Sequence, residues 1–195
     1  MKARILELCY RHQLAHIGSC LTTADVLATI ETPACVILSA GHAGIAYYCW
    51  LESIGLGDAE DRFLKEGAQP HLGYAIPCST GSLGQGITVA VGYALANPRQ
   101  RTHCIITDGE CAEGCVWEAL HFIRKKDLWN LTIHANLNGY SALSAVDVDD
   151  LGARLRSFLP AIRIYTTNSQ QYSFLRGINA HYHVMTEEDY AETLR

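Results

Sequence analysis

The sequence predicts an α/β fold, in which a parallel sheet carries helices on both of its faces. The first observation is a set of short apolar runs, at 35–38, 102–107 and 131–135, that have the length of buried strands. The second is that a polar loop and then a stretch with helical spacing follow the first two runs. Parallel strands need such a crossover segment, so the alternation indicates a parallel sheet.

Length and composition exclude several classes of protein. The 195 residues fit one domain that spans 1–195, and they are enough to bury a core. The chain is 49% hydrophobic and 18% charged, with a formal net charge of −5 and no run of Lys and Arg that would neutralise nucleic-acid phosphates. Residues 1–8 include charged side chains throughout, and no apolar run reaches the length of a membrane span. We therefore expect a cytoplasmic protein that binds neither nucleic acid nor membrane.

The eight cysteines are expected to be reduced. Most of them lie inside apolar runs, where a buried thiol packs as a small hydrophobic side chain, and no secretion signal is apparent. Cys111 and Cys115 lie near His103 and His121 in the sequence, which leaves a zinc site as an alternative. Their spacing is not that of a standard zinc pair.

The remaining elements follow from helical spacing, capping residues and breaks at glycine or proline. An apolar stripe predicts a first helix over 2–15, which is expected to stop near Gly18. Thr22 and Thr23 are expected to cap a second helix over 24–31. The other predicted elements are helices at 43–55, 58–65, 87–97 and 113–126, a strand at 163–167, and a final helix capped by Thr186.

Two polar residues stand at the ends of adjacent predicted strands. Asp108 and Asn138 both belong at the carboxyl edge of the sheet, where the ligand crevice of an open parallel sheet lies. A carboxylate oxygen, an amide oxygen and a backbone carbonyl near Tyr140 suit a small hard cation, Mg²⁺ or Ca²⁺, with positions left open for a diphosphate. The alternative is that both residues simply begin Asp-Gly and Asn-Gly turns.

A glycine-rich run lies at the end of a long connection, 66–82, and precedes an apolar helix. The run reads Ser79-Thr80-Gly81-Ser82-Leu83-Gly84-Gln85-Gly86. The order of its glycines is not that of a dinucleotide-binding fingerprint, and no Gly-Lys-Ser/Thr of a phosphate-binding P-loop follows. Long connections in compact domains are often functional. The alternative is a glycine-rich helix start that packs on a neighbouring segment.

This run resembles, almost letter for letter, the Ser-Thr-Gly-x-Leu-Gly-Gln-Gly element of the transketolase family. Asp108-Gly109 with Asn138 is similar to the family's thiamine-diphosphate motif, in which Gly-Asp-Gly is followed by Asn at about this distance. Two further segments resemble the family, 39–43 its Ser-Lys-Gly-His-Ala element and 113–119 its Glu-Gly-x-x-Trp-Glu-Ala helix. The resemblance covers nearly the whole chain and implies the thiamine-diphosphate-binding fold.

The chain departs from the family's pattern at several positions. Thr107 replaces the first Gly of the motif, Ala40 replaces a Lys, and Asn136 stands where transketolases commonly have Asp. The chain is also shortened after residue 140, where 145–151 arrives early at the place of a Val-Asp-Gly-His-Asp element and contains no His. These departures leave the metal-binding positions of the motif intact.

The resemblance implies a role for each matching residue. Thiamine diphosphate and Mg²⁺ or Ca²⁺ are the implied cofactors, and the implied metal ligands are Asp108, Asn138 and Tyr140. The implied cofactor contacts are His42, Gly81, Ser82, Leu83, Gly109, Glu110 and Asn138. The implied catalytic histidines are His16, His42, His71 and His181, which would orient the substrate and move protons.

The activity implied by the resemblance is transfer of a two-carbon ketol unit between sugars or related carbonyl compounds. In transketolases the catalytic Glu belongs to a pyrimidine-binding domain, which this chain lacks. The chain is therefore expected to be the N-terminal, diphosphate-binding subunit of a split transketolase. Its partner would be a C-terminal subunit that carries the pyrimidine-binding domain, in a heterotetramer, with ketose and aldose substrates. The alternative is a degenerate, non-catalytic subunit with a structural or regulatory role.

Overall fold

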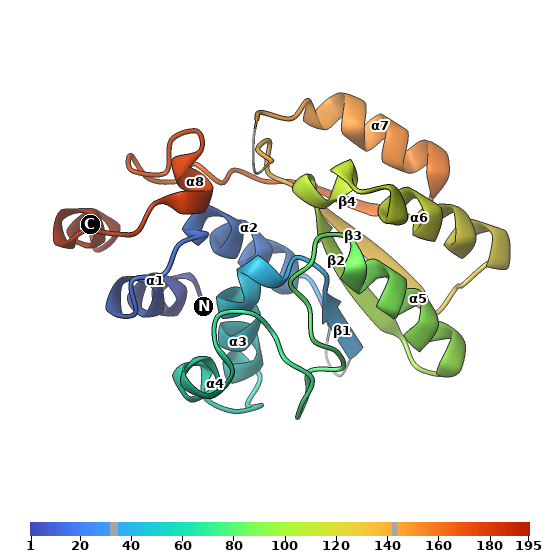
Figure 1. Cartoon of the computed structure of the whole chain (residues 1–195), viewed down its shortest axis with the longest axis horizontal. Helices are drawn as coiled ribbons and strands as arrows, with labels where there is room; N and C mark the ends of the chain where they lie inside the picture. Colours follow the sequence, from blue (N-terminus) through green and yellow to red (C-terminus); the bar gives the residue numbers. More distant parts are fainter. Residues whose placement is uncertain (32–34, 142–143) are drawn as a thin grey trace.

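A parallel sheet lies at the centre of the molecule, as predicted (Figure 1). The structure is a computed structural model that describes residues 1–31, 35–141 and 144–195. Within these residues the sheet has four strands, and each strand pairs in parallel with the next one along the chain. The order is β1 (Cys35–Leu38), β2 (Thr102–Thr107), β3 (Leu131–Leu137) and β4 (Arg163–Thr166).

Helices cover both faces of the sheet (Figure 1). Because the strands are added in one direction, right-handed crossovers place the last helix before each of β2, β3 and β4 on one face. That face carries α5 (Gln85–Ala96), α6 (Gly114–Lys126) and α7 (Val148–Phe158). The opposite face carries α1 (Lys2–Arg11), α2 (Ile17–Leu27) and α3 (Gly44–Ser53), with α4 (Ala59–Glu66) packed on α3. The last two helices, α8 (Asn179–Tyr182) and α9 (Glu187–Thr193), contact α2 and α1 respectively.

The first three strands are buried on both faces, because helices cover both sides of them. Val36 and Ile105 belong to the hydrophobic cluster on the α1–α3 side, whereas Ile37, Cys104 and Ile133 belong to the cluster on the α5–α7 side. This two-sided burial explains why the strands appear in the sequence as continuous apolar runs rather than as alternating ones. All eight cysteines are free in the structure.

The prediction for the second helix was wrong. The helix begins at Ile17, directly after His16, and ends at Leu27, whereas the sequence pattern predicted 24–31. Gly18 suggested a helix stop, but it lies in the first turn of α2. A Cβ there would lie 2.7 Å from the backbone carbonyl oxygen of Ser169 and 2.9 Å from that of Ala180. The glycine is therefore explained by close packing of two backbones rather than by helix termination.

The segment after β3 forms a helix that the sequence pattern did not predict. Residues 145–151 were compared with a Val-Asp-Gly-His-Asp element, but Asp147 is the N-cap of α7. Its Oδ1 accepts hydrogen bonds from the backbone N–H groups of Asp149 and Asp150 at 3.1 and 3.0 Å. An Asp at this position satisfies N–H groups that have no partner within the helix. The final helix begins as predicted, with Thr186 in a capping box with Asp189.

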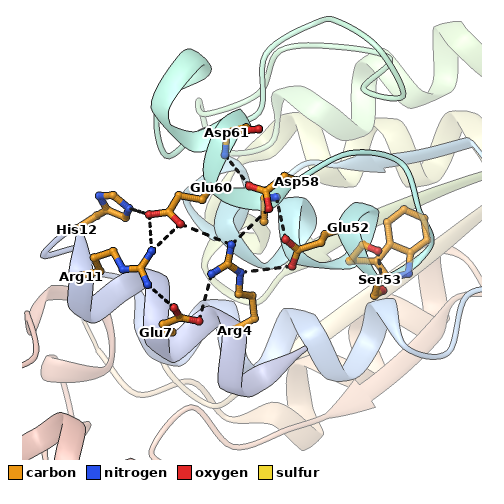
Figure 2. Close-up of polar contacts among 11 residues, drawn as sticks. Arg4, Glu7, Arg11, His12, Glu52, Ser53, Asp58, Glu60 and Asp61 are labelled. Carbon is orange, nitrogen blue, oxygen red and sulfur yellow. Dashed lines mark hydrogen bonds and ion pairs between the residues drawn. The ribbon is translucent and has the colours of Figure 1, made fainter.

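A network of ion pairs joins α1 to α3 and α4 at one corner of the molecule (Figure 2). Arg4 on α1 lies 3.5 Å from Glu52 on α3 and 3.6 Å from Glu60 on α4. Arg11 and His12 also contact Glu60, at 2.7 and 2.8 Å. Several charges that share partners in this way fix the relative positions of the helices better than isolated surface pairs do. Within the described residues, no helix is long and apolar enough to cross a membrane.

Candidate functional site

A cavity of about 270 Å³ opens at the carboxyl ends of β2 and β3, where the fold predicts a ligand crevice. The loops that follow the two strands form one wall. The start of α2, the α8 segment and the connection before α5 contribute the others. The described residues that line it are His16, His42, Gln69, Gly81, Leu83, Thr107, Asp108, Gly109, Asn138, Tyr140, Ser141, His181 and Tyr182.

Asp108 joins the loops after β2 and β3. Its carboxylate is nearly buried, at 3% exposure. Oδ2 accepts hydrogen bonds from the backbone N–H groups of Asn138 and Gly139 at 2.9 and 2.8 Å, and Oδ1 accepts one from Gly109 at 3.1 Å. Burial raises the pKa of Asp108 to about 6, although these hydrogen bonds favour the charged form. A positive charge in the cavity would favour the ionised carboxylate.

The oxygen atoms at this end of the cavity fit a small hard cation. An ionised carboxylate offers about four lone-pair sites and an amide oxygen two. Three backbone N–H groups occupy three of the lone-pair sites on the Asp108 carboxylate and leave one open. The Tyr140 N–H donates to the Asn138 Oδ1 at 3.1 Å and leaves the other lone pair of that oxygen open. Carboxylate, amide and backbone carbonyl oxygens are the ligands that Mg²⁺ and Ca²⁺ prefer. Among the described residues, no group of three or more His, Cys, Asp or Glu could hold a metal, so the zinc alternative gains no support.

Three histidines from distant parts of the chain meet in the cavity. The ring centroid of His16 lies 5.2 Å from that of His42 and 6.2 Å from that of His181, and the latter two lie 6.5 Å apart. Burial lowers the pKa of all three rings, and it lowers that of His42 to about 3. The cavity therefore holds neutral imidazoles at neutral pH, each able to donate from one nitrogen and accept at the other.

The hydrogen bonds of these histidines differ. His181 Nε2 lies 3.2 Å from the backbone carbonyl oxygen of Tyr140, and its Nδ1 lies 3.1 Å from the Ser19 hydroxyl. A carbonyl only accepts, so the proton is assigned to Nε2 and Nδ1 accepts from Ser19. In the described part of the chain, His16 Nδ1 is buried without a hydrogen-bond partner. An unpaired buried nitrogen that lines a cavity is a polar position for a ligand.

His71 lies apart from the other three histidines. It is exposed in the connection between α4 and α5, and it does not line the cavity. Gln69, two residues earlier, lines the cavity instead, and its side chain lies against Gly81. A Cβ on Gly81 would meet the Gln69 Oε1 at 2.4 Å. No sequence pattern indicates Gln69, because it lies in an irregular loop without helix or strand periodicity.

The glycine-rich run divides between the cavity and the core. Gly81 and Leu83 line the cavity, whereas Ser82 is exposed outside it. Gly86 packs α5 on the loop after β1, where a Cβ would lie 2.4 Å from the Ser39 Cα. The packing interpretation is confirmed for Gly86, whereas cofactor binding by Gly81 and Leu83 stays a prediction that their place in the cavity lining allows.

Glu110 lies behind the cavity rather than in it. It is fully buried, and it accepts hydrogen bonds from the Ser39 hydroxyl and from the backbone N–H groups of Gly84 and Thr107, the latter two at 2.9 and 3.1 Å. Burial raises its pKa to about 7. Its contacts connect the segments after β1, before α5 and after β2. In the structure Glu110 supports the loops that carry the site.

Asn136 has a structural role that explains why an amide suits this position. Its Nδ2 donates to the Thr22 hydroxyl oxygen at 3.0 Å, and its Oδ1 accepts from the Thr167 hydroxyl at 2.6 Å. An amide can donate and accept at once, whereas a carboxylate only accepts. The side chain therefore connects β3 to α2 and to the end of β4. Tyr182 and Ser141, which the sequence did not single out, complete the cavity lining.

The fold and the cavity together define an open α/β protein with a polar crevice at the carboxyl edge of its parallel sheet. Comparison with known proteins then shows which chains this one resembles. The chain is 37% identical over 114 residues to a transketolase from Pongo abelii, in a match that covers 52% of this chain and 18% of that protein. It is 32% identical over 151 residues to the 6-deoxy-6-sulfo-D-fructose transketolase subunit SqwG of Clostridium sp. (strain MSTE9), with 64% of this chain and 55% of that subunit covered.

The fold comparison agrees with the sequence comparison. A transketolase from Leishmania mexicana matches with a TM-score of 0.77 at 18% identity, over 98% of this chain and 39% of that one. No family model matches the chain. The chain is similar to transketolases in sequence over about half to two thirds of its length, and in fold over nearly all of it. The match spans less than a fifth of the Pongo abelii protein, 18% of its length.

Proposed function

We propose that this chain is the diphosphate-binding part of a thiamine-diphosphate-dependent transketolase that moves a two-carbon ketol unit between sugars or related carbonyl compounds. The observation that carries the proposal is the position of Asp108. Its carboxylate lines the cavity and is held by the backbone of the Asn138 loop, so the two side chains that match the family's metal motif lie together. Two unrelated Asp-Gly and Asn-Gly turns would not require this arrangement.

The residues present define a role for each side of the cavity. Asp108, the Asn138 amide oxygen and the Tyr140 carbonyl would hold Mg²⁺ or Ca²⁺, and His42 would donate a hydrogen bond to the diphosphate. When bound, thiamine diphosphate supplies the nucleophilic carbon that takes up the two-carbon unit. Neutral His16, whose Nδ1 has no partner among the described residues, would hydrogen-bond the hydroxyl and carbonyl oxygens of the substrate and hold a proton at a ring nitrogen. His181 would do so once one of its two hydrogen bonds, to Tyr140 or to Ser19, opens.

The composition of the cavity supports a partner subunit. Of the described residues that line it, Asp108 is the only one with a carboxyl group, and Asp108 is assigned to the metal. A second carboxylate for proton transfer to the cofactor would have to come from another domain or chain. The name of the Clostridium relative describes it as a subunit, which agrees with an active site divided between polypeptides. We assign the second carboxylate to a pyrimidine-domain partner in a heterotetramer, in the cytoplasm.

The test is cofactor binding by the complex assembled from this chain and a transketolase C-terminal-type partner. Titration of thiamine diphosphate, followed by calorimetry with and without Mg²⁺, is expected to show metal-dependent binding for the wild type. Asp108→Asn removes the charge at nearly constant size, so it should abolish the metal dependence. The matched control is Asp149→Asn, which changes an exposed acid on α7 and should bind like the wild type. Equal metal-dependent affinity for Asp108→Asn would refute the metal assignment.

A second measurement separates an active subunit from a degenerate one. Deuterium exchange at C2 of bound thiamine diphosphate, followed by NMR, reports the first chemical step and needs no substrate. An active complex should exchange this proton faster than free cofactor does. A folded complex that binds cofactor but exchanges no faster would favour the non-catalytic alternative, with a structural or regulatory role for this chain.

A further inference from the structure

A second cavity lies at the opposite end of the sheet, where β3 and β4 begin. Its volume is about 420 Å³, within the range of roughly 300–1,000 Å³ typical of small-molecule sites. The end of α6, the start of β3 and the loop before β4 enclose it. The floor of the cavity is apolar, and its rim is polar and aromatic. Its lining includes Arg124, Asp127, Leu128, Trp129, Leu159 and Arg163.

Trp129 is the most unusual feature of this rim. Its side chain is 74% exposed, whereas Trp50 is buried at 5% exposure. An indole with so much free surface contributes little to the core, but it offers a flat face on which a planar ring can stack. Nucleic-acid bases stack on aromatic side chains in this way, whatever their sequence.

Two guanidinium groups line the same cavity. In the described part of the chain, neither Arg124 nor Arg163 lies within ion-pair distance of a carboxylate. Arg124 donates one hydrogen bond from Nη1 to the Ser157 carbonyl oxygen at 2.9 Å, which leaves most of its five N–H donors free. Asp127 is the one acid in the lining, so the two arginines leave a net positive charge.

The position of Arg124 alone has a simpler explanation, because basic residues in the last turn complement the helix dipole of α6. That explanation does not extend to Arg163, which begins β4, or to the exposed indole. Guanidinium groups match the geometry of phosphate oxygens and bind them with two hydrogen bonds.

We propose that this cavity binds a nucleoside phosphate, which combines a planar aromatic base with an anionic phosphate. The aromatic ring stacks on Trp129 and the phosphate lies between Arg124 and Arg163. The site is separate from the cofactor crevice, since the two cavities share no lining residue and lie at opposite ends of the strands. The inference does not depend on the proposed transferase function.

The test is isothermal calorimetry of the full chain with adenosine monophosphate, adenosine and inorganic phosphate as probes. Adenosine monophosphate is expected to bind with saturation at least tenfold tighter than either of the other two. Arg163→Gln and Trp129→Ala should each weaken it at least tenfold. Arg154→Gln, a surface arginine on α7 outside the cavity, is the matched control and should bind like the wild type. Asp108→Asn should also bind normally, which separates this site from the crevice.

Each other outcome overturns part or all of the proposal. Absence of saturable binding at millimolar adenosine monophosphate removes the site. Phosphate that binds as tightly as the nucleotide removes the stacking role of Trp129, because the charge alone would then explain affinity. Loss of binding in Asp108→Asn with full binding in Arg163→Gln assigns the nucleotide to the crevice instead. Circular dichroism of each variant establishes that the fold is retained.

Discussion

A series of hydrogen bonds around the buried His134 makes the stability of this protein depend on pH. His134 on β3 is fully buried, and its Nε2 lies 2.9 Å from His103 Nδ1 on β2. Its Nδ1 lies 3.0 Å from the hydroxyl of Tyr165 on β4, which in turn lies 3.1 Å from the Thr29 hydroxyl beyond α2. These hydrogen bonds cross three strands and occupy both nitrogens of His134, so an added proton would require one of the partners to change from donor to acceptor inside the core.

The direction of the pH effect follows from the shifted pKa. Burial, the neighbouring His103 and then Arg163 lower the pKa of His134 from 6.5 to about 3. Between these values the unfolded state binds a proton that the folded state excludes. The stabilising contribution of the neutral ring is therefore complete above pH 6.5 and is lost progressively as the pH falls toward 3. Between pH 7.5 and pH 5 a single group of this kind loses about 2 kcal/mol of unfolding free energy.

The assay is urea denaturation at several pH values between 5 and 7.5, followed by circular dichroism. His134→Gln cannot take up the proton, so its unfolding free energy should fall by about 2 kcal/mol less than that of the wild type over this range. The variant is expected to be less stable than the wild type at pH 7.5, because it breaks the hydrogen-bonded chain. His121→Gln, at an exposed position on α6, should retain the wild-type pH dependence. Parallel curves for His134→Gln and wild type would refute the argument.

Two further predictions concern packing and capping. Gly86→Ala should destabilise the protein by about 2 kcal/mol or more, because its Cβ would lie 2.4 Å from the Ser39 Cα; Gly92→Ala on the same helix, with nothing within 4 Å of the added Cβ, should instead stabilise by roughly 0.5–1 kcal/mol in thermal unfolding. Asp147→Ala removes the N-cap of α7 and should cost about 1 kcal/mol in urea denaturation, whereas Asp147→Asn keeps a capping oxygen and should recover most of it. No difference between the two glycine variants, or between the two Asp147 variants, would contradict these accounts.

The sequence was sufficient where a local pattern reports directly on structure. Short apolar runs predicted β1 to β3, because strands covered on both faces need no polar residues. Asp108 and Asn138 could be placed together, because the carboxyl ends of adjacent parallel strands meet at one edge. Their shared hydrogen bonds were not predictable, since they depend on loop geometry.

Prediction failed where tertiary packing overrides the local pattern. Helix α2 is buried on nearly all sides, so it shows no polar face from which its start could be recognised, and Gly18 serves a backbone contact that no local sequence reveals. Gln69 and Tyr182 reach the cavity only through the path of irregular loops. His71 resembled a site residue by its neighbours in sequence, yet its side chain is exposed outside the cavity.

One wall of the crevice joins segments that are far apart in the sequence, whereas the sheet joins strands that follow one another. The backbone N–H of His16 donates to the carbonyl oxygen of His181 at 2.7 Å, and Lys2 similarly reaches Gln171 at 3.2 Å. Each strand, by contrast, pairs with its immediate successor in the chain. During synthesis the sheet can therefore assemble strand by strand, whereas one wall of the crevice waits until the segment around His181 has emerged from the ribosome. A nascent chain halted after β4 would hold the Asp108 end of the crevice together with His16 and His42, but without His181 and Tyr182, so this wall of the crevice forms after the sheet.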